Sequence, residues 1–255
     1  MISRIFTLIF LLSMPQWLFA QDIPDFSANY LVRLKGLSAG ELKRELSTNI
    51  DGSRTFSSKS QAKGIFAFFK PDLVEETSIW LQKGKIIQPQ SYLYQRTGGK
   101  KDKYLNLSFD WENHIVNIDN KKQTWALDAK PYTFDKLTYQ LALMSDLGQK
   151  KKEFSYQIAD SHKLKTYNII ILGTEIITTP LGKIEAIKLV RQRSSKSQRQ
   201  TTLWCAPALN YLPVRIEHIE KDGTNFTAEL RRLKGIDITS AFEKKVAKTS
   251  ALPSH

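Results

Sequence analysis

Residues 73–97, "LVEETSIWLQKGKIIQPQSYLYQRT", have the pattern of two β-strands joined by a tight turn. β-Branched and aromatic side chains recur on both sides of Gly84 at the period of two that is typical of extended strands. Glycine tolerates the backbone angles that such a turn needs. We expect Trp80 to pair across the turn with Tyr92 or Tyr94. The stretch therefore predicts an antiparallel hairpin.

The same pattern continues along most of the chain. Three further segments precede this hairpin, and the dipeptide Asp51-Gly52 between two of them is a strong turn signal. Another hairpin follows at residues 103–119, and a second series of strands runs from about residue 150 to 233. Strands at this spacing indicate an all-β protein, mainly antiparallel, built as a curved sheet or an open β-barrel.

One segment departs from the period of two. In "YTFDKLTYQLALMSDLG", Leu137, Leu141 and Met144 recur at helical spacing, and Thr133 or Asp135 suits the start of a helix. We predict one significant helix over residues 134–147. It serves either as a lid on one β-structure or as a linker between two halves. Because the strand pattern is the same on both sides of it, we expect a single β-rich domain over residues 21–235.

The first twenty residues have the pattern of a secretory signal peptide. A short positive region ending at Arg4 precedes the apolar run "IFTLIFLLSM", and Pro15 follows it. The run is too short for a transmembrane helix, which needs roughly twenty apolar residues. We therefore expect cleavage after Ala20, a periplasmic location and no stable membrane anchor. Residues 236–255 are polar and charged, and we expect them to form a flexible tail.

The chain is strongly basic. Its formal net charge is +13 at pH 7, and removal of Arg4 with the leader leaves +12. Such an excess favours anionic surfaces, for example phospholipid headgroups or the phosphates of lipopolysaccharide. Export argues against nucleic acid as the partner. A basic envelope protein without any specific anionic ligand is the alternative.

The stretch "TLWCAPALNYLPVRIEH", residues 202–218, holds the only cysteine. A catalytic thiol needs a neighbouring base and an accessible, electropositive setting. In a hairpin that pairs residues 203–205 with 213–215, His218 lies several residues beyond the partner of Cys205. An unpaired cysteine is usually buried. We interpret Cys205 as a structural residue.

No other pattern in the sequence points to catalysis. The four histidines have no paired spacing, so we expect neither a metal site nor a cofactor. Glu75 and Glu76 are adjacent in a strand and face opposite sides. Arg191, Arg193 and Arg215 are expected to form cross-strand ion pairs with Glu175, Glu185 or Glu217 rather than an anion site. We therefore expect a protein that is not an enzyme.

The C-terminal third resembles a known family. Gly173 with Glu175, the turn at residues 179–182, Trp204 with Pro207, "LPVR" at 212–215 and the Asp222-Gly223 hairpin are similar to the hallmark of the bacterial exported family called domain of unknown function 3108. The resemblance implies a periplasmic, β-rich protein of no established activity. It also implies an architecture similar to the open barrels of periplasmic lipoprotein carriers, which by itself specifies no function.

Two functions remain open from the sequence. The first is a non-catalytic carrier that binds an apolar or amphipathic envelope ligand, such as a lipid or an acyl chain, in an open barrel. The second is a structural or assembly factor of the envelope that works through protein or glycan contacts. For the first, we expect the ligand to contact an aromatic cluster and two tryptophans: Phe66, Phe68, Phe69, Trp80 and Trp204.

Overall fold

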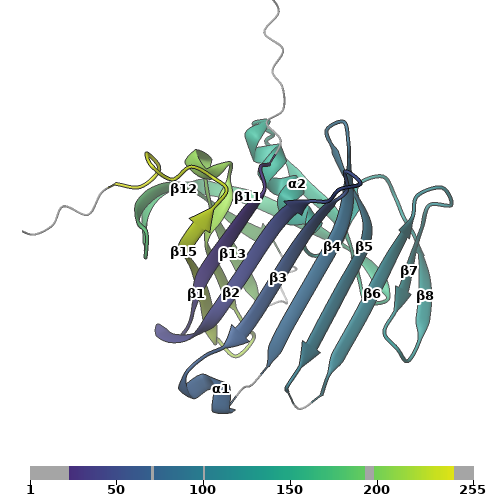
Figure 1. Ribbon diagram of the computed structural model, residues 1–255, viewed down its shortest axis with the longest axis horizontal. Helices are drawn as coiled ribbons and strands as arrows, with labels where there is room; N and C mark the ends of the chain where they lie inside the picture. Colours follow the sequence, from purple (N-terminus) through teal and green to yellow (C-terminus); the bar gives the residue numbers. More distant parts are fainter. Residues whose placement is uncertain (1–22, 70–71, 100, 193–197, 244–255) are drawn as a thin grey trace, which may run out of the picture.

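The computed structural model describes residues 23–69, 72–99, 101–192 and 198–243. The predicted signal peptide lies outside the described residues. From the N-terminus, the first half of the chain forms β1 (Phe26–Leu34), β2 (Leu37–Thr48), β3 (Arg54–Ala62), the short helix α1 (Ile65–Phe69), β4 (Leu73–Lys83), β5 (Ile86–Thr97), β6 (Lys103–Asp110), β7 (Ile115–Asp119) and β8 (Thr124–Asp128) (Figure 1).

The second half begins with a short strand and the longer helix. It comprises β9 (Thr133–Phe134), α2 (Thr138–Gly148), β10 (Phe154–Asp160), β11 (Lys163–Thr179), β12 (Gly182–Gln192), β13 (Gln200–Ala206), the 3-10 turn η1 (Pro207–Leu209), β14 (Leu212–Ile219) and β15 (Asn225–Lys234). Helix α2 thus follows the first nine strands of the chain and precedes the last six.

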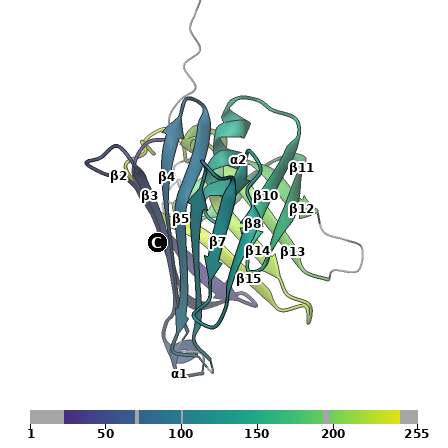
Figure 2. The same cartoon turned by 90° about the vertical axis from the view of Figure 1, so that its right-hand side faces the viewer.

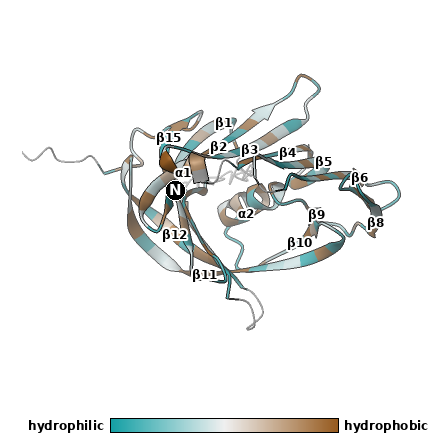
Figure 3. Ribbon diagram, turned by 90° about the horizontal axis from the view of Figure 1, so that it is seen from below, coloured by the Kyte–Doolittle hydropathy of each residue, from teal (hydrophilic) through white to brown (hydrophobic). Residues whose placement is uncertain are grey.

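All the described strands belong to one sheet, which confirms the predicted fold class. The strand order is β8-β7-β6-β5-β4-β3-β2-β1-β15-β14-β13-β12-β11-β10-β9. Every neighbouring pair is antiparallel except β9 with β10. The sheet curls into an open barrel (Figures 2 and 3). β8 and β9 are its two edge strands, and each pairs with a neighbour on one side only. Trp125 of β8 lies 6.3 Å, between ring centroids, from His162 of the β10–β11 turn, so side chains meet where the backbones do not.

The hairpins form where the sequence predicts them, with one change of register. Gly52, Gly84 and Gly223 occupy their turns with positive φ, a conformation that glycine adopts readily. Trp80, however, pairs with Pro89, while Tyr92 pairs with Ser78. The expected pairing of Trp80 with a tyrosine is wrong, because the tight turn pairs Lys83 with Ile86 and the register counted from there puts Pro89 opposite Trp80.

Helix α2 fills the inside of the barrel. It starts at Thr138, four residues later than the sequence predicts, because Thr133 and Phe134 pair with β10 as strand β9. Seven of its eleven residues are buried, and Leu137, Leu141 and Met144 are at most 3 % exposed. Viewed from below, α2 lies within the curve of the sheet, between the β1–β5 wall and β10–β11 (Figure 3). It is therefore part of the core, neither a lid nor an exposed linker.

A buried carboxylate sets the start of α2. Asp135 is fully buried, and its side chain accepts hydrogen bonds from the backbone N–H groups of Leu137 and Thr138, at 2.7 and 2.9 Å. The hydroxyls of Ser78 and Thr138 donate to its other oxygen at 2.6 and 2.8 Å. These bonds satisfy N–H groups that have no partner within the helix. They also attach α2 to β4.

The first and last strands join the two halves of the sheet. β1 pairs with β15 from Ser27↔Lys234 to Leu34↔Phe226. Directly after β15, Gly235 has φ +86, and a Cβ there would lie 2.1 Å from the carbonyl oxygen of Asp25. The chain then stays against the barrel: Ile236, Ile238, Ala241 and Phe242 pack on the core. This part of the predicted tail is therefore held in place, while residues 244–255 lie outside the described residues.

Substitution of Asp135 tests its role at the start of α2. We expect Asp135→Ala to lower the free energy of unfolding by about 2 kcal/mol, because several donors lose a buried acceptor. Asp135→Asn keeps an acceptor oxygen and should retain most of the stability. Denaturant unfolding followed by tryptophan fluorescence measures both. Equal stability of wild type and Asp135→Ala would contradict this role.

The same carboxyl group predicts a pH dependence. Burial raises the pKa of Asp135 above its ordinary value of 3.8, although its hydrogen bonds oppose the shift. A raised pKa means that the folded protein binds the proton more tightly than the unfolded chain does, so this group contributes most at low pH and loses that contribution as pH rises. Wild type should therefore gain stability relative to Asp135→Asn as the pH falls toward 3.8. A difference that does not change with pH would argue against it.

Candidate functional site

The five residues predicted to bind a ligand lie in three separate parts of the structure. Phe66 and Phe68 are on α1; Phe68 is 88 % exposed and Phe66 is half-buried. The side chain of Phe69 lies outside the described part. Trp80 is 1 % exposed and faces the interior, and Trp204 is buried on the face opposite to that of Cys205. The structure therefore does not bring these residues into one pocket.

Phe66 and Phe68 do not line a pocket, because the chain leaves the sheet between β3 and β4. Between β3 and β4 it forms the five-residue helix α1 at one end of the barrel (Figure 1). Residues three apart on a helix share a face. Ile65 and Phe68 are so related, and they are 67 % and 88 % exposed. These side chains face solvent.

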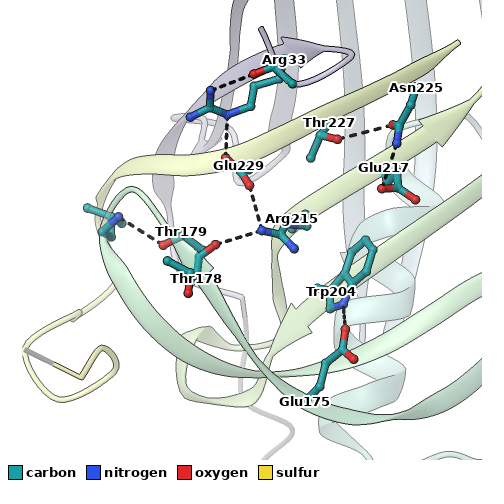
Figure 4. A network of polar contacts seen from close by, with 12 residues as sticks. Arg33, Glu175, Thr178, Thr179, Trp204, Arg215, Glu217, Asn225, Thr227 and Glu229 are labelled. Carbon is teal, nitrogen blue, oxygen red and sulfur yellow. Dashed lines mark hydrogen bonds and ion pairs between the residues drawn. The ribbon is translucent and has the colours of Figure 1, made fainter. Parts of the chain in front are cut away.

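Trp204 belongs to a polar network on the face of the sheet away from Cys205 (Figure 4). Its indole N–H donates to the carboxylate of Glu175, and this bond lowers the pKa of Glu175. The Lys188 ammonium and the Arg215 guanidinium lie 5.2 and 5.6 Å from the centre of its ring. Such cation–π contacts cover an aromatic face with charged groups. Neighbouring side chains of the same protein therefore already contact both the indole N–H and the ring of Trp204.

Cross-strand ion pairs extend from this network, as the sequence predicts for Arg215. Its guanidinium pairs with Glu229 at 2.8 Å and also donates to the carbonyl of Thr178 at 3.0 Å. Arg33 of β1 pairs with the same Glu229 at 3.1 Å. The expected partners were Glu175, Glu185 or Glu217, so the partner is a correction. It differs because β14 lies beside β15, where Arg215 is directly opposite Glu229.

A polar groove of about 970 Å³ lies beside the start of α2. Its walls come from β10, β11, the end of β12 and the residues that precede β13. It is lined by Lys136, Asp160, Lys163, Leu164, Lys165, Thr166, Tyr167, Asn168, Arg191, Gln192 and Arg199. Five of these residues are cationic, and Asp160 is the one carboxylate among the lining residues. The groove is therefore electropositive.

Asp160 is shared by two lysines at the centre of the groove. Lys136 Nζ lies 2.7 Å from one carboxylate oxygen, and Lys165 Nζ contacts the other. Burial alone would raise the pKa of Asp160, but the two ammonium groups lower it below its ordinary value. Asp160 is thus ionised at neutral pH. One negative charge between two positive ones leaves this cluster with a net positive charge.

The remaining cations of the groove differ in how they are held. Arg191 lies 4.1 Å from the ring centre of Tyr167, and Arg199 pairs with Glu220 at 2.7 Å. Among the described residues, no carboxylate forms an ion pair with Lys163, which is exposed. The ion pair predicted for Arg191 is wrong, because its guanidinium lies on the Tyr167 ring and Ile169 is opposite it in the sheet. Lys163 is available to an incoming anion. Arg193, a further predicted member of the ion-pair set, lies outside the described residues.

Polar contacts also join α2 to the β1–β5 wall of the barrel. The Tyr92 hydroxyl donates to the carboxylate of Glu76 at 2.5 Å, and burial raises the pKa of Glu76. Arg44 donates to the side chain of Gln140 on α2 at 2.8 Å. Together with the apolar residues of α2, these side chains fill the space between the helix and the β1–β5 wall.

The described residues were also considered as metal ligands and as membrane-spanning helices. Within the described ranges, no group of three or more His, Cys, Asp or Glu residues could hold a metal ion. No helix in the described part of the chain is long and apolar enough to cross a bilayer.

The comparison with known families agrees with the fold. A profile described as "Protein of unknown function (DUF3108)" matches residues 29–231. The chain belongs to the DUF3108 family. The family resemblance seen in the sequence motifs is thereby confirmed, and it extends over nearly all strands of the sheet. No curated protein matches this DUF3108 sequence.

The DUF3108 barrel is similar in fold to solved structures. One is a β-barrel-like protein of the domain of unknown function DUF1849 from Brucella abortus, with a TM-score of 0.55 and 8 % identity over 84 % of this chain and 99 % of that one. At this identity the likeness shows the fold alone. Another match is MucB in complex with MucA(peri), with 8 % identity over 87 % and 92 % of the two chains; its TM-score of 0.17 does not establish a common fold.

The thiol of the DUF3108 chain is sealed in the barrel. Cys205 is fully buried opposite Pro213, and burial raises the pKa of its thiol to about 12. His218 instead pairs with Thr201, whose hydroxyl lies 2.9 Å from its Nδ1.

We expect no reaction of the native protein with an aromatic disulfide reagent at mildly alkaline pH, and one thiol per chain after denaturation. Cys205→Ser should cost about 1–2 kcal/mol of stability. Rapid labelling of the native protein would contradict the structural role.

Proposed function

We propose that this DUF3108 protein is an exported, non-catalytic binding protein whose groove holds the anionic group of an envelope amphiphile. The observation that carries the proposal is the composition of the groove: five cations surround one carboxylate in a volume of about 970 Å³. Pockets for small ligands have volumes of roughly 300–1,000 Å³. A phosphate or carboxylate group matches this charge.

An apolar strip beside the groove favours an amphiphile over a simple anion. Tyr167, Ile169 and Ile171 alternate along one face of β11, and Tyr167 lines the groove. Ile169 is 4 % exposed and Ile171 is 45 % exposed, so the strip becomes accessible at Ile171. A headgroup bound by Lys163 and Arg191 would place its chain along this strip. The aromatic residues of α1 have no part in this binding site.

Binding of short-chain lipids tests the proposal. We expect dihexanoyl phosphatidylglycerol to bind more tightly than dihexanoyl phosphatidylcholine, because only the first carries a net negative charge. The combined substitution of Lys163→Gln and Arg191→Gln should weaken binding about tenfold, and salt should weaken it further since the screening length falls to about 3 Å at 1 M. Lys85→Gln, on the β4–β5 turn, is the matched control. Isothermal titration calorimetry measures each.

The arms of this experiment separate the alternatives. If inorganic phosphate binds as tightly as the lipid, the acyl chains of the lipid contribute nothing to the affinity. Ile171→Asn should weaken lipid binding and leave phosphate binding unchanged. Equal binding of both lipids, or none by the wild type, would overturn the proposal and leave the envelope assembly factor as the better hypothesis.

Export is the second part of the proposal, and it rests on the leader sequence. Residues 1–25 fused to a reporter that is active only outside the cytoplasm should give activity, and the mature protein should begin at Gln21. N-terminal sequencing of the periplasmic fraction checks the cleavage site. Recovery of the full-length chain in the membrane fraction would show instead that the apolar segment is retained.

A further inference from the structure

Helix α1 and the neighbouring β1–β2 turn expose large apolar side chains at one end of the barrel. Ile65 and Phe68 on α1 are 67 % and 88 % exposed, and Leu37 beside the β1–β2 turn is 65 % exposed. The N–H of Lys63 donates to the carbonyl of Ala39 at 3.0 Å, which holds the start of α1 beside β2. We call Leu37, Ile65 and Phe68 the apolar tip. Apolar groups gathered at a protruding end mark an interaction site.

Exposed lysines lie at the same end of the barrel as the apolar tip. Because neighbouring strands are antiparallel, the β1–β2, β3–β4, β5–β6, β7–β8 and β14–β15 turns all lie at the α1 end (Figure 1). These turns and their flanks carry Lys35, Lys63, Lys101, Lys121, Lys122 and Lys221, all exposed. Asp102 and Asp222 are the exposed carboxylates in the described parts of the same turns, and exposed Glu41 of β2 lies 3.9 Å from Lys63. The end that presents the apolar tip is therefore positively charged.

We propose that this end of the barrel docks on the surface of an anionic phospholipid bilayer, with the apolar tip inserted among the headgroups. Exposed apolar side chains at the same end as several exposed lysines have the composition of an interfacial membrane anchor. Lysine side chains near an anionic leaflet are attracted to its surface potential. The lysines are exposed and spread over several turns, which suits an extended charged surface. The inference does not depend on what the groove binds.

Vesicle binding tests this docking with the full mature protein. We expect cosedimentation with phosphatidylcholine vesicles that contain phosphatidylglycerol, little with phosphatidylcholine alone, and loss of binding at high salt. The double substitution of Ile65→Ser and Phe68→Ser should reduce the bound fraction about tenfold. Ile50→Ser is the matched control, because Ile50 is fully exposed on the β2–β3 turn at the opposite end. All three substituted side chains are exposed, so the melting temperature should not change.

A fluorescent label gives the orientation directly. Phe68→Cys and Ile50→Cys can each be labelled with an environment-sensitive dye, since Cys205 is buried. The label at position 68 should brighten and shift to the blue on anionic vesicles, while the label at position 50 should not change. An equal response at both positions would overturn the proposed orientation.

The remaining outcomes separate docking from ligand binding in the groove. Vesicle binding that survives loss of the apolar tip but disappears with Lys163→Gln and Arg191→Gln would overturn the docking proposal and support the groove. Vesicle binding that depends on the apolar tip, in a protein that binds no short-chain lipid, would support docking and overturn the function proposed for the groove. Equal binding to neutral and anionic vesicles would contradict the role of the lysines.

Discussion

The pairing of β1 with β15 is the contact on which the rest of the architecture depends. Each half of the sheet is a series of strands that pair mostly with their sequence neighbours, and this one ladder joins the halves across almost the whole chain. It places β8 and β9 at the two ends of the strand order, so the sheet curls and the barrel remains open. Gly235 allows the backbone after β15 to approach the backbone of Asp25, just before β1.

Curvature of the joined sheet creates an interior that α2 fills. The helix is apolar over most of its surface, and its start is tied to β4 through Asp135 and Ser78. A barrel of this kind with an empty interior would suit an acyl chain, whereas this one has a core. Space for a ligand remains beside the start of the helix, where Lys136 and Asp160 meet. The site is electropositive because the lysines of β11 and the arginine of β12 converge there around one carboxylate.

The proposed ligand groove and the proposed membrane-docking surface lie at the same end of the molecule. The β10–β11 turn, which supplies Lys163, and the residues before β13, which supply Arg199, belong to the α1 end by the alternation of the strands. A bilayer that contacts the apolar tip would therefore lie close to the mouth of the groove. The opposite end carries the Asp51-Gly52 turn and the β4–β5 turn.

The sequence by itself determined the local features of this protein. The period of two and the turn glycines predicted the hairpins, the apolar spacing of Leu137, Leu141 and Met144 predicted α2 to within a few residues, and the lack of a base beside Cys205 predicted an inert thiol. These features depend on residues close together in the chain, where alternation and turn geometry act directly. The family motifs added the expectation of an open barrel.

Only the tertiary structure decided which side chains meet. Lys136, Asp160 and Arg191 come from separate elements, and their convergence depends on the curvature of the sheet and on the position of α2. Trp80 and Trp204, which look equivalent in sequence, end in the core and in an ion-pair network on another face. The aromatic run at α1 was expected to contact a ligand, but the chain leaves the sheet there and exposes Phe68. The physical reason is that alternation specifies the two faces of a strand and not what lies opposite each face, which long-range pairing alone establishes.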